Sequence, residues 1–401
     1  MNTDLFEELL KTPSLFKDER SLDINFIPNR LPHRRKEISL LSQLFLTLLT
    51  DPTAISRKIL ITGKTGIGKT ASVKLFGEML KKALDKRNIS IKYVHINCRK
   101  ERTSYKVLIK IIQSINNNFP KRGYSPQDLL EIINNFLNLQ NLHLLIVLDE
   151  LNYLINIDKD LIYSLTRLND DSFNTPQRLS IIGIVRNISC INNLDVSTLS
   201  TLQRNIIKFD TYTKEQIFDI IKFRAGLSLK KNAISDELIK MIAEIVNLEG
   251  DIRHGLNLLW KACKIAQSKN LKSITSECIR LANQDLVPFS TLDVLKDMTV
   301  QKLIFLLSIV ILLKNSKEPQ ISFVDILKSY HMLCENTGMK PRSYSQLWSY
   351  LQEYKRENLI AVNLQSKKVK GRRALIEIHD IPLPKFEEII IESLDSKGIK
   401  I

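Results

Sequence analysis

The sequence predicts an α/β domain with a parallel sheet, followed by an all-helical domain and a C-terminal domain of helices and a β-hairpin. In the first half, apolar stretches of strand length alternate with helical patterns. From residue 212 to about 282 the apolar spacing is helical only. Near the C-terminus, two segments alternate apolar and polar residues, as half-exposed strands do. We place the domains at 1–210, 211–286 and 287–401, because 401 residues exceed one ordinary core.

In the first domain, four apolar segments are expected to be strands of a sheet with helices on both faces. The segment at 142–150 is strongly apolar and ends in two acids, as expected of a strand that is buried on both faces. The expected strands are 57–63, 91–97, 142–150 and 178–187, and the expected helices are 38–49, 69–84, 104–115 and 125–139.

The rest of the chain is expected to hold two further domains. Four helices are expected in the middle domain, at 214–227, 235–248, 251–267 and 275–284. In the last domain, helices at 300–314, 321–334 and 343–357 precede strands at 359–365 and 374–380. Three helices followed by a two-stranded hairpin predict a winged helix, a variant of the helix-turn-helix.

Composition narrows the class of protein. The net charge of +16 favours an acidic partner, and nucleic acid is the commonest one. The five cysteines have no metal-ligand spacing, so we expect free thiols in a reducing cytosol. The longest apolar run, at 303–313, is shorter than the ~18 residues of a membrane span, and the first residues do not resemble a signal peptide. We therefore expect a cytoplasmic protein with no membrane segment.

Residues 63–70, "GKTGIGKT", match the phosphate-binding motif G-x-x-x-x-G-K-[ST] between a predicted strand and a predicted helix. Its glycines allow backbone N–H groups to surround phosphate oxygens at the helix N-terminus. Lys69 is expected to reach the β- and γ-phosphates, and Thr70 to bind Mg²⁺. A chance glycine turn is the alternative, but it would not explain the flanking strand and helix. The cofactors expected are therefore ATP or ADP and Mg²⁺.

Asp149 and Glu150 follow the apolar run of the third predicted strand, at the sheet edge where ligands bind in open α/β folds. Asp149 is expected to hold Mg²⁺ with Thr70, and Glu150 to orient an attacking water. Together with Lys69 they are the expected catalytic residues. Two acids that cap the next helix are the alternative, which is weak beside a phosphate-binding loop.

Four motifs, followed by the winged helix, resemble the archaeal origin-recognition initiators. They are "GKTGIGKTASV" at 63–73, "VLDEL" at 147–151, "FRAGL" at 223–227 and "GDIRHGLNLL" at 250–259. These AAA+ proteins are related to the eukaryotic origin-recognition and cell-division-cycle-six proteins, and the resemblance spans almost the whole chain. It implies an AAA+ base, a helical lid and a winged-helix reader of origin DNA.

The resemblance also implies a nucleotide site between base and lid. Arg253 takes the place of the lid arginine called sensor two, although on its own it reads as a surface arginine. The segment at 103–138 resembles the inserted initiator-specific helices, which implies DNA contacts near Lys121 and Arg122. The implied nucleotide-binding residues are Leu31, Pro32, Arg34, Gly63, Lys64, Thr65, Gly66, Ile67, Gly68, Lys69, Thr70, Ala71, Tyr212, Arg224 and Arg253.

Two departures from the family pattern bear on ATP hydrolysis. Arg186 falls where the family usually has the sensor-one asparagine, and Asn187 follows it, so both are sensor candidates. No arginine lies at Ser197, where an arginine finger is expected, and Arg204 is further along the chain. An arginine finger contributes large rate factors. We therefore expect secure nucleotide binding and, at most, slow Mg²⁺-dependent hydrolysis.

The DNA-reading residues are expected on the third helix of the winged domain and on its hairpin. The N-terminal end of that helix carries polar side chains that suit phosphate and base-edge contacts. The hairpin tip at 367–373 has five basic residues in seven, which suits phosphates better than a merely solvated turn. The candidates are Arg342, Ser343, Ser345, Gln346, Lys370, Arg372 and Arg373.

Taken with the resemblance, these features predict a protein that binds double-stranded DNA at replication origins and helps to recruit and load the replicative helicase. ATP would act mainly as a conformational switch, and paralogous initiators are further candidate partners. One alternative is a paralogous regulator that binds origins or promoters and represses initiation. Others are an active AAA+ loader or motor ATPase, and a defence or transposition ATPase with a DNA-binding tail.

Overall fold

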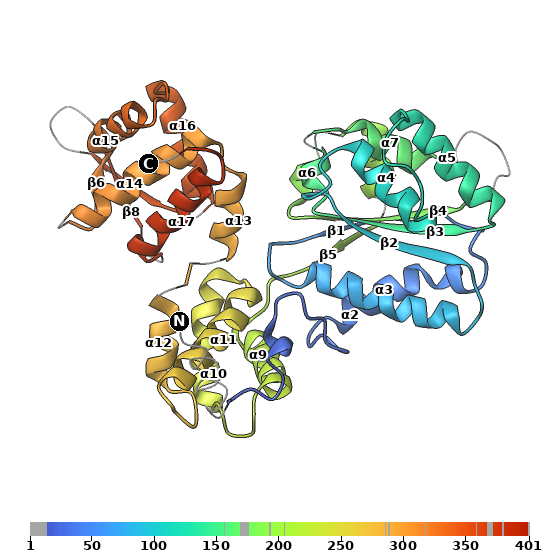
Figure 1. Cartoon of the computed structure of the whole chain (residues 1–401), viewed down its shortest axis with the longest axis horizontal. Helices are drawn as coiled ribbons and strands as arrows, with labels where there is room; N and C mark the ends of the chain where they lie inside the picture. The colour runs from blue at the N-terminus through green and yellow to red at the C-terminus, as the bar shows by residue number, and fades with distance from the viewer. Residues whose placement is uncertain are drawn as a thin grey trace, which may run out of the picture. The chain divides into compact units, whose positions relative to one another are not determined.

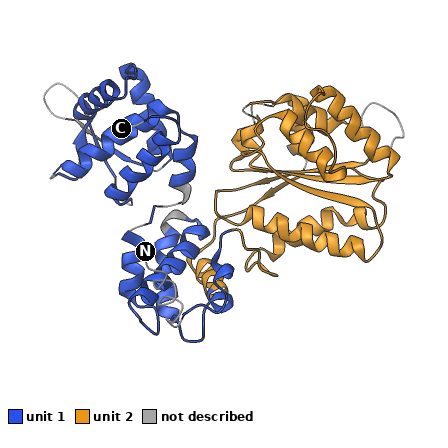
Figure 2. Cartoon of the chain, viewed as in Figure 1, with its two compact units in different colours: residues 1–24, 225–401 blue, residues 25–224 orange. Residues whose placement is uncertain are grey.

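The computed structural model describes most of the chain, in two compact units. Figure 2 shows one unit at residues 25–224 and the other at residues 1–24 and 225–401. The described residues are 14–155, 157–168, 176–191, 194–203, 205–284, 286–287, 289–316, 318–357, 359–366, 372–378 and 381–399.

The unit at 25–224 is built on a five-stranded sheet, in which every strand pairs in parallel with its neighbours. The order is β2-β3-β4-β1-β5, so β1, which leads into the phosphate-binding motif, lies inside the sheet. Every residue of β3 and β4 is buried, which explains their unbroken apolar sequences. The strands are β1 (Lys58–Thr62), β2 (Ile91–Asn97), β3 (His143–Asp149), β4 (Leu179–Val185) and β5 (Ile206–Lys208).

Helices cover both faces of this sheet. In Figure 1, α2 (Arg35–Leu44) and α3 (Lys69–Asp85) lie on one face, and α4 (Ser104–Ile115), α5 (Pro126–Leu139) and α7 (Asp160–Arg167) on the other. Ser125 and Asp128 form a reciprocal capping box that starts α5. The predicted α/β domain is confirmed. Shorter elements complete it: η2 (Leu46–Leu49), α6 (Asn152–Ile155), η3 (Ile188–Ile191) and α8 (Val196–Gln203).

The middle of the chain is helical, as predicted. Helix α9 (Lys214–Ser228) crosses the boundary between the two units, and α10 (Asp236–Glu249), α11 (Ile252–Ser268) and α12 (Ser276–Gln284) follow. Helix α10 ends at Glu249 and is capped by Gly250, whose φ of 74° is left-handed, and Asp251 then caps α11. The N-terminal turn η1 (Glu19–Leu22) is held to α11, because the Trp260 Nε1 donates to Glu19 Oε1 at 2.7 Å.

The C-terminal part is the predicted winged helix. An apolar core joins its helices to an antiparallel sheet of order β6-β8-β7, and α14 contributes much of that core. The elements are α13 (Phe289–Asp297), α14 (Val300–Asn315), β6 (Ile321–Ser322), α15 (Phe323–Asn336), α16 (Tyr344–Arg356), β7 (Ala361–Ser366), β8 (Arg372–Glu377) and α17 (Leu383–Asp395).

Two expectations from composition can be compared with the structure. The apolar run at 303–313 lies within α14, where it is mostly buried in the domain core. Among the described residues, the structure has no helix whose length and apolar character would suit a membrane span. The five cysteines are free thiols, four of them buried.

Candidate nucleotide and nucleic-acid sites

The loop between β1 and α3 has the backbone of a phosphate cradle. Gly63, Gly66 and Gly68 have φ values of 150°, 76° and 88°, which other residues adopt only with strain. A Cβ on Gly63 would lie 2.5 Å from the Phe209 carbonyl oxygen, and one on Gly68 would lie 2.9 Å from the Tyr212 hydroxyl. The loop therefore requires glycine at both ends, and its backbone leads directly into the N-terminus of α3.

Lys69 places its charge at this loop. Its side chain is 9% exposed, and Nζ donates to the carbonyl oxygens of Gly63 and Lys64, each at 2.6 Å. Thr70 is the next residue of α3 and is half-buried. A cradle of backbone groups with a lysine and a hydroxyl at its edge fits a nucleoside triphosphate with Mg²⁺. Thr65, Gly66 and Ala71 are also half-buried, whereas Lys64 is exposed and Ile67 is buried.

Asp149 ends β3 and is held from two sides. Its side chain is buried; Oδ1 accepts from the Glu150 N–H at 3.0 Å, and Oδ2 lies 3.1 Å from His95 Nε2. Tyr93 Oη lies 3.3 Å from the other ring nitrogen of His95. The sequence analysis assigned His95 no role. The signal it missed is that Tyr93, His95 and Asn97 alternate along β2, and Asn97 pairs with Asp149.

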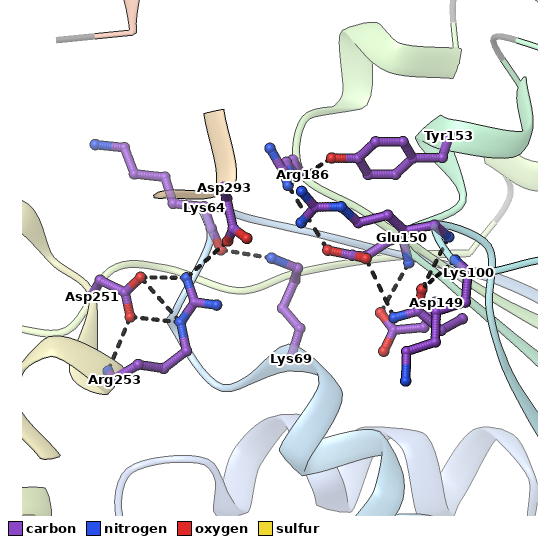
Figure 3. A network of polar contacts seen from close by, with 12 residues as sticks. Lys64, Lys69, Lys100, Asp149, Glu150, Tyr153, Arg186, Asp251, Arg253 and Asp293 are labelled. Atoms are coloured by element: carbon purple, nitrogen blue, oxygen red, sulfur yellow. Dashed lines mark hydrogen bonds and ion pairs between the residues drawn. The ribbon is translucent and has the colours of Figure 1, made fainter. Parts of the chain in front are cut away.

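Glu150 has a strained backbone and two side-chain partners. Its φ is 54°, a left-handed value that is rare outside glycine and that recurs at functional sites. Asn97 Nδ2 donates to Oε2 at 3.3 Å. Arg186 Nη2 lies 3.8 Å from Oε1, and Figure 3 shows this ion pair. Burial and the Asp149 charge raise the pKa of Glu150, and the charges of Arg186 and Arg99 oppose that shift.

The two sensor candidates have different surroundings. Arg186 follows directly after the last residue of β4, which pairs with Thr62 of β1, so it lies at the sheet edge beside both motifs. Its Nη2 also donates to Tyr153 Oη at 3.1 Å. Asn187 is exposed, and its Oδ1 accepts from the Ser189 N–H at 3.3 Å. Of the two, Arg186 is the one that the structure places beside the acidic pair.

Arg34 holds the phosphate-binding loop through hydrogen bonds to its backbone. It is 4% exposed, and Nε and Nη2 both donate to the Ile67 carbonyl oxygen, at 3.1 and 2.9 Å. It also donates to the Tyr212 hydroxyl at 2.8 Å, to the Asp210 carbonyl at 2.8 Å and to Glu37 at 2.6 Å. Burial raises the pKa of Tyr212, against the neighbouring Arg34 charge. These contacts tie the loop to the chain segments before α2 and α9.

The other expected nucleotide-binding residues are more scattered. Leu31 and Pro32 are half-buried just before α2, and Arg224 is buried, with Nη1 donating to the Phe26 carbonyl oxygen at 3.3 Å. Arg253 belongs to the other compact unit. There its Nη2 lies 2.5 Å from Asp251 and 3.3 Å from Asp293.

The region of the expected arginine finger holds a different arginine. Ser197, near the start of α8, accepts a hydrogen bond from Arg167 of α7. Arg204 lies outside the described residues. An arginine that a linear reading of the sequence did not associate with Ser197 is thus brought to it by the fold.

The candidate DNA-binding side chains are exposed where the structure describes them. Arg342, Ser343, Ser345 and Gln346 are all exposed at the start of α16. Tyr344 among them is 62% exposed and packs edge-on against Phe323, a feature that the sequence analysis did not single out.

The hairpin and the insertion add further candidates. Lys370 lies outside the described residues, and Arg372 and Arg373 begin β8, where the structure describes only their backbone, paired with Ser366 and Gln365. Lys121 and Arg122 are exposed between α4 and α5, in the unit that carries the phosphate loop.

Comparison with known families accounts for most of the chain. A family model described as an AAA domain matches residues 56–186. The Cdc6 AAA+ ATPase-type lid domain matches residues 218–284, and the CDC6 C-terminal winged helix domain matches residues 293–382.

Similar proteins match over nearly their full length. The ORC1-type DNA replication protein 2 of Sulfolobus acidocaldarius is 32% identical, over 96% of this chain and 95% of its own. The crystal structure of Cdc6p from Pyrobaculum aerophilum has a TM-score of 0.63 and 29% identity, covering 96% of this chain and 100% of that one.

A third relative shares the fold. The Aeropyrum pernix ORC1 protein, solved in complex with DNA, has a TM-score of 0.75 at 23% identity and covers 94% of this chain and 97% of that one. The 32% identity over 95% of the Sulfolobus sequence, with the AAA, lid and winged-helix matches, shows that the chain belongs to the family of ORC1-type DNA replication proteins.

Proposed function

We propose that the chain is an ATP-dependent, duplex-DNA-binding protein that marks replication origins in the cytoplasm, with ATP acting mainly as a conformational switch. The observation that carries this proposal is the built phosphate loop, with Lys69 and the buried Asp149, in a chain that also has a winged helix. The exposed polar residues at the start of α16 and the net charge of +16 support the DNA-binding part.

The nucleotide would be held by groups that the fold already positions. Backbone N–H groups of the loop and the Lys69 ammonium would bind the phosphates, and Thr70 and Asp149 would hold Mg²⁺. Bound Mg²⁺ would neutralise phosphate charge. His95 would keep the Asp149 carboxylate in place, and Arg34 would keep the loop in its bound shape. We propose a base at 1–210, a lid at 211–286 that contributes Arg253, and a winged helix at 287–401.

A switch fits the site better than a fast motor. Glu150, which would orient water, has both carboxylate oxygens engaged, by Asn97 and Arg186. Arg253 also forms ion pairs with two carboxylates of its own unit, those of Asp251 and Asp293. We extend the proposal to recruitment and loading of the replicative helicase, alone or with paralogous initiators. That extension is supported by family membership alone.

Nuclease footprinting of the purified protein on its own genomic DNA tests the proposal. With ATP, we expect a discrete protected site near a replication start, lost or weakened in Arg372→Ala/Arg373→Ala and altered in Lys69→Ala. The matched control is Lys240→Ala/Lys272→Ala, which removes two exposed lysines from the lid region and should leave the footprint intact. Diffuse, salt-sensitive protection together with rapid ATP turnover would contradict the proposal and favour an active loader or motor.

A repressor would give the same footprint. The two roles separate when purified helicase is added to the protein–DNA complex. Recruitment of helicase to the protected site supports an initiator, whereas a stable footprint that excludes the helicase supports the regulator.

A further inference from the structure

Arg186 is positioned by the sheet rather than by chance. The last pair of β4 with β1 joins Val185 to Thr62, so residue 186 is the first beyond the sheet edge, between the acidic pair and the phosphate loop. Its side chain is 27% exposed and that of Glu150 is 24% exposed. An ion pair between two mostly buried groups is screened much less than one at the surface.

Tyr153 orients this guanidinium. The Tyr153 hydroxyl accepts a hydrogen bond from Arg186 Nη2 at 3.1 Å, and the centroid of the Tyr153 ring lies 5.6 Å from Arg186 Cζ. Tyr153 belongs to α6, which begins two residues after Glu150. The Leu151 N–H donates to the Ile184 carbonyl at 2.9 Å and joins this segment to β4. The carboxylate and the anchor of the arginine therefore lie on one short, tethered segment (Figure 3).

Both oxygens of Glu150 are engaged, but by different kinds of partner. Asn97 is neutral and contacts Oε2, whereas Arg186 is charged and contacts Oε1. In hydrolysis the water oxygen bonds to the γ-phosphorus, the bond to the ADP oxygen breaks, and a water proton passes to a carboxylate. For Glu150 to take that part, it has to leave a partner of opposite charge. A neutral residue at position 186 would remove the electrostatic part of that restraint.

We propose that Arg186 is a positioning residue that restrains Glu150 and keeps ATP hydrolysis slow, so that the ATP-bound state lasts. The proposal rests on the ATP site proposed above. It assigns Arg186 a role through Glu150 and not a direct contact with the terminal phosphate.

Single-turnover hydrolysis measured beside ATP and ADP affinity tests this role. Arg186→Gln should raise the rate about three- to tenfold, the factor expected for a partly buried ion pair, with both affinities unchanged. Arg186→Lys keeps the charge and should stay near the wild-type rate. Tyr153→Phe removes the anchoring hydroxyl and should give an intermediate rise. Arg87→Gln is the matched control, because Arg87 is an exposed arginine two residues beyond the end of α3.

A second readout needs no nucleotide. Thermal unfolding is compared for Arg186→Gln, Glu150→Gln and the double variant, all nucleotide-free. If the two side chains are coupled, the double variant should shift the melting temperature by less than the sum of the single shifts. Additive shifts would overturn the ion pair and, with it, the restraint.

The outcomes separate the restraint from the proposed function. If the wild-type chain binds no ATP, or Lys69→Ala binds it equally well, the proposed function fails and the restraint fails with it. If ATP binds at this site but Arg186→Gln hydrolyses it no faster than wild type, the restraint alone is overturned. A slower rate with a selective loss of ATP over ADP affinity would overturn it in favour of a phosphate contact by Arg186.

Discussion

Replacing Arg34 by alanine should destabilise the unit that carries the phosphate loop. Arg34 is 4% exposed, and its guanidinium donates hydrogen bonds to Ile67, Tyr212, Asp210 and Glu37. Its removal leaves two carbonyls short of a donor, at about 1–3 kcal/mol for each buried group left unsatisfied. It also leaves the mostly buried Glu37 carboxylate without its ion-pair partner. Breaking such a buried pair costs about 3–5 kcal/mol.

These losses overlap, so we expect about 3–5 kcal/mol in total. For a unit of residues 25–224, each kcal/mol lowers the melting temperature by about 2–4 °C, giving a shift of about 6–20 °C. Differential scanning calorimetry of the full chain measures it. The control is Arg35→Ala, which changes the exposed neighbour of Arg34. Arg34→Lys should lower the melting temperature by an intermediate amount, because lysine keeps the charge but lacks the several planar N–H donors of the guanidinium. A shift of less than about 2 °C would refute the supporting role.

Three further changes test the site and its surroundings. Gly68→Ala, with φ at 88° and a Cβ 2.9 Å from the Tyr212 hydroxyl, should weaken ATP binding about tenfold or more in calorimetric titration. His95→Ala should lower the Mg²⁺-dependent part of the ATP affinity about tenfold, because Asp149 loses its hydrogen-bond partner. His95→Gln should restore much of that affinity. An ATP affinity that depends on Mg²⁺ as in wild type would contradict this role of His95. Burial lowers the pKa of His143 to about 4, whereas its pKa in the unfolded chain is near 6.5. Between pH 6.5 and pH 4 this histidine is therefore protonated in the unfolded chain but not in the folded one, so acid favours unfolding. The melting temperature should therefore fall as the pH drops from 7 to 4, less steeply in His143→Gln, and equal slopes would speak against this group.

Much of the fold could be predicted from periodicity. The four strands and the paired helices of the base follow from apolar runs and helical spacing, as do the three helices and hairpin of the winged domain. The elements that the sequence analysis did not predict are mostly short or have no clear apolar pattern. Strand β5 has three residues, β6 has two, and α13 follows Pro288 in a segment for which no element was expected. Helix α17 follows the hairpin, where the winged-helix pattern set no expectation of a further helix.

The site was predictable where a motif is contiguous and less so where it depends on the fold. The residues of the loop at 63–70 are contiguous in the sequence, and so are Asp149 and Glu150, so linear motifs find them. Two partners of that pair, Asn97 and His95, come from β2, and only strand pairing brings them to Asp149 and Glu150. Which of Arg186 and Asn187 lies beside the acidic pair depends on a one-residue register, and that register follows from the pairing of Val185 with Thr62.

We propose that nucleotide bound at the phosphate loop controls how the chain binds duplex DNA. The most direct measurement is a fluorescence anisotropy titration of the footprinted duplex with nucleotide-free, ADP-bound and ATP-bound protein, and with Lys69→Ala. We expect ATP to change the affinity or the salt dependence of wild-type binding, and we expect no such change in Lys69→Ala. Identical titrations in all three nucleotide states of the wild-type protein, with ATP binding verified separately, would contradict it.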